Sequence, residues 1–255
     1  MSIDAALVQR LSNRLVTARA DRRAIAPLSD DHPDITLATG YEVQLAGFDG
    51  DQVGWKLGVT SRAKQRQVGI DAPIYGMLGA ADALDIAEPL VVASHIQPRV
   101  EPEIALLIGE DLDGAHVTAS DVLRATEAVA VAMEVLDSRY EAYRFTMPDV
   151  VADNASLGRF VVGDWVEVRG IDLRLVGVVL EHRGDVVASA AGAASLGHPA
   201  AAVAWLVRAL AAAGDGLETG DVIMSGGLTA AVPVAAGDSV VTTIDRLGSL
   251  VLACV

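Results

Sequence analysis

The 255-residue sequence predicts an α+β fold in which a mixed or antiparallel β-sheet forms the core and an N-terminal helical arm precedes it. Three observations predict this fold. Apolar residues follow helical spacing over residues 3–22, and from Val53 onward the apolar pattern changes to short β-like runs. Hairpin-like turns such as Arg183-Gly-Asp185 join most of these runs, which favours antiparallel neighbours.

The arm is predicted over residues 1–50 and contains two expected helices, at about 3–22 and 36–48. Asp4 is placed to cap the start of the first helix. Between the helices, Ser29-Asp-Asp-His-Pro33 predicts a loop. Two helices ahead of a β-rich chain indicate an arm or a lid.

Residues 51–255 are predicted to form the catalytic, β-rich core of the same single domain, 1–255, because no internal repeat or low-complexity linker interrupts them. The predicted strands are 54–59, 91–96, 100–108, 129–136, 160–168, 173–181, 185–190, 221–225, 239–244 and 248–255. The predicted helices are 62–68, 118–128 and 199–213. Asp215-Gly216 is expected to end the last helix.

Composition narrows the function classes. Hydrophobic residues make up 52% of the chain and aromatic residues 4%, so an aliphatic core is expected. The formal net charge of −15 disfavours nucleic-acid binding, because an acidic surface repels phosphates. The single cysteine, Cys254, excludes a disulfide within one chain and fits a reducing cytoplasm.

Two further features also favour a cytoplasmic location without membrane association. The N-terminus shows no basic segment ahead of an apolar stretch, so no signal peptide is expected. The most apolar long stretch, 199–214, is interrupted by Arg208 and is too short to span a bilayer.

Three carboxylates lie beside apolar, β-prone runs. Glu101 and Glu103 flank a proline within 99–108, and because residues i and i+2 of a strand share one side, both charges are aimed at one place. Glu134 lies in a second apolar run. Partly buried carboxylates share protons or hold a cation, and a third carboxylate favours the cation. The alternative is an exposed edge strand, where Pro102 is at home.

All-oxygen ligands indicate a hard divalent ion, Mg²⁺ above all, with Mn²⁺ or Ca²⁺ as alternatives. Zinc is disfavoured because no histidine or cysteine lies at a short ligand spacing from the pair. Lys56 lies inside an apolar strand pattern, where its ammonium either reaches solvent or meets a carboxylate or a substrate.

Other polar residues have a structural and a functional interpretation. Asp153, Asn154 and Ser156 have the chemistry of an Asx-type turn, and they also offer donors to an anionic substrate. Arg139 is expected to pair with Asp137. 

The glycine-rich segment 225–229 fits a tight turn, or a place where Gly226 and Gly227 let the backbone approach a ligand. His198 is expected near a helix N-cap. The sequence contains no Gly-x-Gly-x-x-Gly, P-loop or Gly-x-Ser-x-Gly motif, so nucleotide binding and serine-hydrolase chemistry have little support.

Taken together, the segments 54–61, 100–105, 134–140 and 151–156 resemble the fumarylacetoacetate hydrolase superfamily, in the branch of 2-oxopent-4-enoate hydratases and 4-oxalocrotonate decarboxylases. The resemblance extends from the Pro33 region to the C-terminus. It implies the β-roll fold of that family's C-terminal domain. It also implies that Glu101, Glu103 and Glu134 ligate Mg²⁺ or Mn²⁺, with Lys56 as the active-site lysine.

Within that branch the chain is most like the decarboxylases. Hydratases tend to carry Asp-Tyr-Gly where this chain has Ile74-Tyr-Gly76, and Gly-Asn-Pro where it has Gly197-His-Pro199. The decarboxylases resemble it at both places and also at 149–154 and 226–234. The segment 49–53 is shorter than the family pattern, which leaves the packing of the arm open.

The resemblance implies metal-dependent decarboxylation of 2-oxo-3-hexenedioate to 2-hydroxypenta-2,4-dienoate in aromatic meta-cleavage catabolism. The metal is expected to chelate the 2-oxo acid, Lys56 to pair with the developing enolate or to relay a proton, and Ile74 to desolvate the leaving carboxylate. The expected substrate-binding residues are Ile74, Arg139, Asp153, Asn154, Ser156, Gly226, Gly227 and Thr229.

Two alternatives stay open at this point: a hydratase acting on the dienoate, and a non-catalytic partner subunit of such a hydratase. The three converging carboxylates argue against a non-catalytic subunit. The resemblance also implies a homo-oligomer, possible association with a hydratase homologue, and a small dicarboxylate 2-oxo acid as the substrate.

Overall fold

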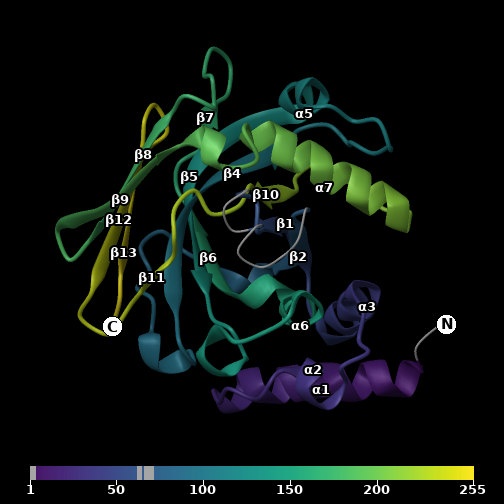
Figure 1. Ribbon diagram of the computed structural model, residues 1–255. Helices are drawn as coiled ribbons and strands as arrows, with labels where there is room; N and C mark the ends of the chain where they lie inside the picture. Colours follow the sequence, from purple (N-terminus) through teal and green to yellow (C-terminus); the bar gives the residue numbers. More distant parts are fainter. Residues whose placement is uncertain (1–3, 62–64, 66–71) are drawn as a thin grey trace.

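The computed structural model describes residues 4–61, 65 and 72–255. The helix expected at 62–68 lies outside the described residues, apart from Gln65. The architecture is α+β with N-terminal helices, as predicted, and these helices pack against one end of the β-rich core (Figure 1).

The arm begins with α1 (Ala5–Asp21), whose N-terminus is capped by Asp4 as predicted. The expected second helix is α3 (Leu37–Gly47), which starts at a Thr36 capping box. The loop expected between them is in part a short helix, α2 (Leu28–Asp31). This helix forms because the Asp149 carboxylate accepts hydrogen bonds from the Ser29 backbone N–H and from the Ser29 hydroxyl.

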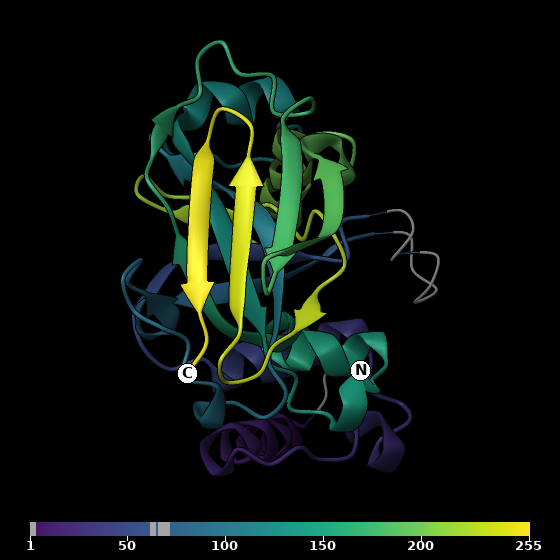
Figure 2. The same cartoon turned by 90° about the vertical axis from the view of Figure 1, so that its left-hand side faces the viewer.

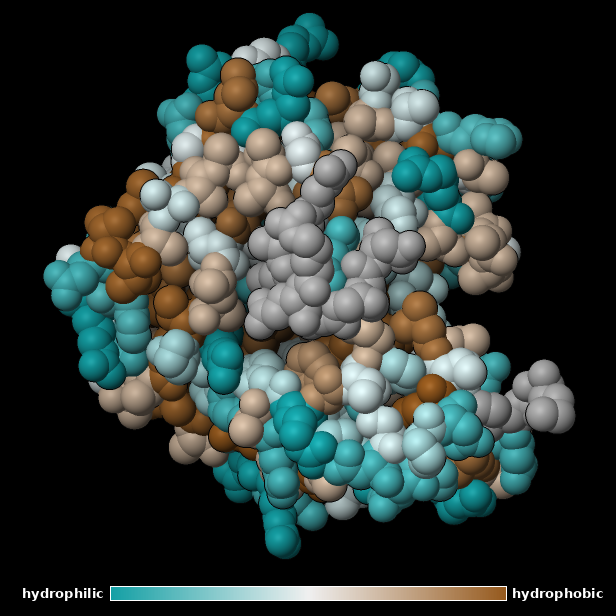
Figure 3. All heavy atoms as spheres, in the orientation of Figure 1, coloured by the Kyte–Doolittle hydropathy of each residue, from teal (hydrophilic) through white to brown (hydrophobic). Residues whose placement is uncertain are grey.

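The arm lies against α6 (Met147–Ala152), a helix that the sequence pattern did not reveal. The Gln44 side chain of α3 donates hydrogen bonds to the backbone oxygens of Tyr75 (3.1 Å) and Val151 (2.9 Å). A separate apolar cluster joins the arm to the core through the buried residues Val8, Leu11, Leu15, Leu28, Val43, Tyr140 and Ala152. On the face shown in Figure 3, hydrophilic residues dominate the lower part of the molecule, over the arm.

The larger sheet has the strand order β2-β1-β10-β4-β5-β6-β3, with β11 paired to β4 and β7 paired to β5. Among the described strands of this sheet, the β1–β10 and β3–β6 pairs are parallel and the other pairs are antiparallel, so the sheet is mixed, as predicted. Its strands are β1 (Gln52–Gly58), β2 (Ile74–Gly79), β3 (Ala83–Leu84), β4 (Arg99–Ile108), β5 (Thr126–Leu136), β6 (Leu157–Val162), β7 (Val166–Glu167), β10 (Val222–Met224) and β11 (Val232–Pro233).

A second, antiparallel sheet has the order β13-β12-β8-β9. Its strands are β8 (Gly177–His182), β9 (Asp185–Ala191), β12 (Ser239–Ile244) and β13 (Gly248–Ala253). Figure 2 looks onto its outer face, on which none of the helices described in the structure lies. Its inner face packs on the larger sheet through buried residues such as Leu180, Val240 and Leu252, which belong to the main apolar core.

Two helices, α5 (Ala119–Ala125) and α7 (Pro199–Ala213), lie together beside the larger sheet (Figure 1). His198 occupies the N-cap of α7, as predicted, and its Nδ1 accepts a hydrogen bond from the Ala200 N–H at 2.9 Å. α7 ends at Ala213, ahead of the expected Asp215-Gly216, because its C-cap residue Gly214 adopts the left-handed conformation (φ 83°) that closes a helix.

Within the described residues, the segment Gly192–Ala213 is long and apolar enough to cross a membrane by length and composition. Most of it is α7, and one side of α7 packs into the main core through Ala202, Val203, Leu206 and Leu210. This is the arrangement of a core helix.

Four further expected segments differ from the structure. The strand predicted at 91–96 is a 3-10 turn, Val92–Ser94, because the Ser94 hydroxyl bonds the Val91 oxygen at 2.7 Å and closes the backbone locally. The helix predicted at 118–128 ends at Ala125, and its last residues begin β5. The run 160–168 divides into β6 and β7, and the run 173–181 becomes a strand only at Gly177. The remaining 3-10 segments are Ala80–Asp82, Glu141–Tyr143, Asn154–Ser156 and Gly192–Ala194.

Candidate active site

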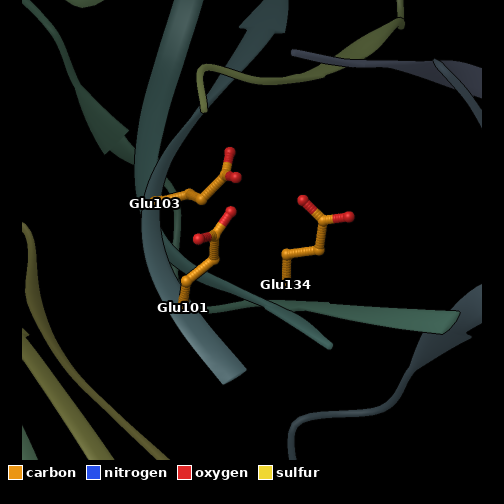
Figure 4. Close-up of side chains that lie close together, drawn as sticks. All are labelled: Glu101, Glu103 and Glu134. Atoms are coloured by element: carbon orange, nitrogen blue, oxygen red, sulfur yellow. The ribbon is translucent and has the colours of Figure 1, made fainter. Parts of the chain in front are cut away.

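The pairing of β4 with β5 brings the three predicted carboxylates together. Glu101 is directly opposite Glu134 in the antiparallel register, and Glu103 lies two residues further along β4 on the same face. One ligand oxygen from each of the three residues lies within 4.8 Å of the others. Figure 4 shows the three carboxyl groups converging from the two strands. The predicted convergence of Glu101, Glu103 and Glu134 is confirmed.

The site is buried. Glu101 is 4% exposed, and Glu103 and Glu134 are 0% exposed, so the alternative of an exposed edge strand is wrong. Pro102 is tolerated in β4 because it lies between the residues that pair with β11 and those that pair with β10.

The glycine-rich segment 225–229 runs beside β4 between β10 and β11, where no described strand pairs with Pro102 on that side. The Ser225 N–H donates to the Ile104 oxygen (3.1 Å) and the Leu228 N–H donates to the Pro102 oxygen (2.9 Å). Between these two hydrogen bonds, Gly226 donates its N–H to Glu103 Oε2 at 2.7 Å.

Two glycines allow this close approach. A Cβ atom on Gly227 would lie 2.3 Å from the carboxyl carbon of Glu101, and Gly226 has a φ of 99°. The structure therefore places both predicted glycines against the carboxylates. Thr229 is half-buried at the end of this segment, and its hydroxyl donates to the Ala230 oxygen at 3.1 Å.

Two carboxylate oxygens in the cluster, Glu103 Oε1 and Glu134 Oε2, are buried without a hydrogen-bond partner in the described part of the chain. Burial raises the pKa of Glu103 well above its ordinary value, and the charges of Glu134 and Glu101 raise it further. Burial also raises the pKa of Glu134, although the nearby Lys56 ammonium opposes this shift. Unpartnered oxygens, high negative charge and an all-oxygen donor set are what a hard divalent cation requires.

Lys56 lies on the same face of the sheet as the carboxylates. It is aligned with Met224 of β10, Met224 with Ala105 of β4, and Ala105 is two residues from Glu103. The Lys56 side chain is 1% exposed. Its ammonium forms an ion pair with Glu134 Oε1 and donates a hydrogen bond to the Ala155 oxygen at 2.9 Å. The buried lysine therefore meets a carboxylate, which was one of its two predicted environments.

Ile74 lies on the Lys56 side of the sheet. Ile74 pairs with Gly58 and Gly76 pairs with Lys56 in the antiparallel β1–β2 register, so the two side chains share one face. Ile74 is 2% exposed and packs in a small apolar cluster with Val150, Val151 and Ala155.

Arg139 pairs with Asp153, and the expected ion pair with Asp137 is wrong. The Asp137 carboxylate instead accepts hydrogen bonds from the backbone N–H groups of Ile96 (3.0 Å) and Gln97 (2.7 Å). The Asp137 carboxylate therefore holds the backbone that precedes β4. Asp153, which lies further along the chain at the end of α6, is the residue that α6 brings next to Arg139.

The other expected substrate-binding residues form hydrogen bonds within the protein. Asn154 donates from Nδ2 to the Met77 oxygen and accepts at Oδ1 from the Met77 N–H, both at 2.8 Å. The Ser156 hydroxyl lies 3.3 Å from Asp153 Oδ2. The predicted turn is therefore present, and its polar atoms hold it in place.

Sequence reasoning missed two participants. The Ala155 oxygen, which accepts from Lys56, is a backbone atom and leaves no signal in the sequence. Gly76 lies opposite Lys56, and a Cβ atom there would be 2.7 Å from Asn154 Oδ1. The isolated glycine within an apolar, β-prone segment was the available signal for Gly76.

Comparison with known proteins places the chain in a family. Residues 55–254 match the family model described as fumarylacetoacetate (FAA) hydrolase C-terminal. The chain belongs to this family. Two curated family members are each 41% identical over 252 residues, covering 95% of both chains: a 4-oxalocrotonate decarboxylase of Pseudomonas sp. (strain CF600) and a 2-keto-4-pentenoate hydratase of Burkholderia vietnamiensis.

A solved family member has nearly the same fold. It is the 4-oxalocrotonate decarboxylase of Pseudomonas putida G7, complexed with magnesium and adipate, with a TM-score of 0.96 and 37% identity. The alignment covers 100% of this chain and 99% of the other. The chain is therefore a member of an enzyme family of decarboxylases and hydratases that includes a metal-bound structure, as the resemblance implied.

Proposed function

We propose that this chain is a Mg²⁺- or Mn²⁺-dependent carbon–carbon lyase that decarboxylates 2-oxo-3-hexenedioate to 2-hydroxypenta-2,4-dienoate in aromatic meta-cleavage catabolism. The single observation that carries the choice of decarboxylation is Ile74, a buried aliphatic side chain on the same sheet face as Lys56. A hydratase must activate a water molecule, for which a carboxylate at this position is useful. An apolar group there excludes water and favours loss of a carboxylate.

The metal ligands are Glu101, Glu103 and Glu134, whose oxygens converge and are in part unpartnered among the described residues. A bound divalent cation supplies Lewis-acid polarisation of the 2-oxo group of the substrate. The intact, buried set of three carboxylates also argues against a non-catalytic partner subunit.

Lys56 is the proposed proton carrier. An ammonium has three N–H donors, and among the described residues those of Lys56 serve Glu134 and the Ala155 oxygen, so the proposal assigns the third to the substrate. Loss of CO₂ breaks the bond between C5 and C6 of 2-oxo-3-hexenedioate, and the electron pair moves along the conjugated chain to the oxygen on C2. Lys56 then delivers the proton that completes the 2-hydroxy group of the product.

Further lining of the substrate is proposed for Ser156, Gly226, Gly227 and Thr229. The two glycines offer close approach of the backbone to the metal ligands. We also propose that residues 1–255 act as a single domain in the cytoplasm, as a homo-oligomer that can associate with a hydratase homologue.

Hydration of 2-hydroxypenta-2,4-dienoate is the second candidate, because the chain is as similar to a curated hydratase as to a curated decarboxylase. In the proposed scheme both candidates use the same metal ligands, and the group at position 74 is the one whose chemistry distinguishes the two reactions.

The test is an ultraviolet time course with purified protein, Mg²⁺ and 2-oxo-3-hexenedioate, with released CO₂ assayed in parallel. We expect CO₂ to appear together with the dienoate absorption band. Ile74→Val, which keeps the site apolar, should retain this activity, whereas Ile74→Asp should lower it about tenfold or more because a carboxyl group admits water and opposes the leaving carboxylate. Hydration of the separately supplied dienoate without any CO₂ release would contradict the proposal.

A further inference from the structure

We infer that the turn Asn154–Ser156 is a positioning device for Lys56, and that Arg139, Asp153 and Asn154 hold it in a strained conformation that aims the Ala155 oxygen at the ammonium. The inference rests on the proposed role of Lys56. It gives these three residues a role other than the expected contact with substrate.

The turn adopts a backbone conformation that its residues disfavour. Asn154, Ala155 and Ser156 have φ values of 48°, 50° and 62°, so three successive residues other than glycine are left-handed. Asparagine tolerates this region, but alanine and serine adopt it at a steric cost. Such strain persists only where the surroundings fix the conformation, and it is common at functional sites.

Arg139 fixes the turn from one side. Its Nε pairs with the Asp153 carboxylate and its Nη2 donates to the Asp153 backbone oxygen. Its Nη1 donates at 2.7 Å to the backbone oxygens of Asp137 and Leu157. Leu157 follows the turn in sequence, and the Asp137 N–H donates to the Ser156 oxygen of the turn at 2.8 Å. Arg139 is 4% exposed, so its guanidinium serves the protein rather than solvent.

Asn154 fixes the turn from the other side. Its amide makes both possible hydrogen bonds to the backbone of Met77, one as donor and one as acceptor, each at 2.8 Å. Met77 lies on β2, next to Gly76, the residue paired with Lys56. The amide therefore ties the turn to the strand that neighbours the lysine.

The consequence is a defined direction for the Lys56 ammonium. The Ala155 oxygen accepts one N–H at 2.9 Å and Glu134 accepts another, which fixes the direction of the third. If the turn relaxed toward a right-handed conformation, the Ala155 oxygen would move and the ammonium would be held by Glu134 alone.

Two matched variants test this. Asn154→Ala removes the amide that holds the turn, whereas Gln44→Ala removes a buried amide that also bonds β2 and α6 but does not touch the turn. The sequence contains only two lysines, Lys56 and Lys64, so ¹³C-lysine labelling gives a spectrum with two side chains, which Lys64→Arg assigns. A fixed ammonium gives Lys56 two distinct ε-proton shifts.

We expect Asn154→Ala to merge the two ε-proton shifts of Lys56 and to lower kcat about tenfold to a hundredfold, with KM changed by less than about twofold. Gln44→Ala should leave the shifts and kcat close to wild type. If Asn154→Ala does not fold, Asn154→Gly replaces it, because glycine adopts the left-handed conformation without steric cost.

Unchanged lysine shifts and kcat in the folded variant, or equal losses in Gln44→Ala, would overturn the inference. The lysine spectrum is measured without substrate. It therefore tests the positioning of Lys56 even if the protein does not decarboxylate 2-oxo-3-hexenedioate, and the two failures can be told apart.

Discussion

Glu103→Gln is expected to reduce decarboxylation by a factor of about 1,000 while the chain stays folded. The amide keeps the shape of the side chain, and its oxygen can still accept the Gly226 N–H. It removes one of the three negative charges that make the site a cation site. The variant should therefore bind Mg²⁺ weakly.

The same substitution should stabilise the metal-free protein. The pKa of Glu103 is raised in the folded state, so between its ordinary value of 4.5 and the raised value the folded chain binds more protons than the unfolded chain. The free energy of unfolding therefore falls as pH rises through this window. Glu103→Gln cannot ionise, so it avoids this decrease in the free energy of unfolding. Each 1 kcal/mol of unfolding free energy that is recovered raises Tm by about 2–4 °C in a chain of this size.

Thermal unfolding with and without Mg²⁺ measures both effects. Wild type should gain about 2.7 kcal/mol at a Mg²⁺ concentration 100 times Kd, and the variant should gain little. The matched control is Glu127→Gln, an exposed glutamate on β5, which should change neither quantity. Wild-type Mg²⁺ stabilisation in Glu103→Gln, with full activity, would remove Glu103 from the metal site.

Lys56→Met is expected to lower kcat by about 10²–10⁴, which is the usual range for loss of a general acid or base. The substitution keeps a long apolar stem but removes the only cation that contacts Glu134 among the described residues. Without metal the buried Glu134 carboxylate then lacks its cationic partner, which destabilises the fold by about 3–5 kcal/mol.

Lys56→Met should not weaken metal binding, although it lowers kcat and the stability of the metal-free protein. Because the Lys56 ammonium competes with a cation for Glu134, Lys56→Met should bind Mn²⁺ at least as tightly as wild type. Isothermal titration with Mn²⁺, run beside the activity assay, separates a catalytic lysine from a structural support of the ligands. Arg208→Met is the matched control, because it removes a positively charged side chain on α7. It should leave Mn²⁺ binding and kcat unchanged. Loss of Mn²⁺ binding in Lys56→Met would contradict the proposed role.

Local pattern predicted the metal-site candidates because strand geometry is periodic. Glu101 and Glu103 share a face through the two-residue repeat of a strand, and Lys56 was placed by its apolar neighbours. That Glu134 lies directly opposite Glu101 depends on the β4–β5 register, which the sequence alone does not give. The resemblance to a family implied only that Glu134 joins Glu101 and Glu103 as a ligand, and the structure shows the register and the convergence of the three side chains.

Features decided by long-range contacts were not predictable. Asp137 is the near neighbour of Arg139 in sequence, but α6 carries Asp153 to the arginine and backbone N–H groups occupy Asp137. The β-prone run at 91–96 becomes a turn through a local serine hydrogen bond. The Ala155 oxygen contributes to the site through its backbone conformation, to which its side chain gives no clue.

The metal site is tested most directly by anomalous X-ray diffraction from crystals of the wild-type chain grown with Mn²⁺. We expect one strong manganese peak per chain, bounded by carboxylate oxygens of Glu101, Glu103 and Glu134. A peak bound by other residues, or no peak at these carboxylates at saturating Mn²⁺, would contradict the assignment of the three glutamates as the metal ligands.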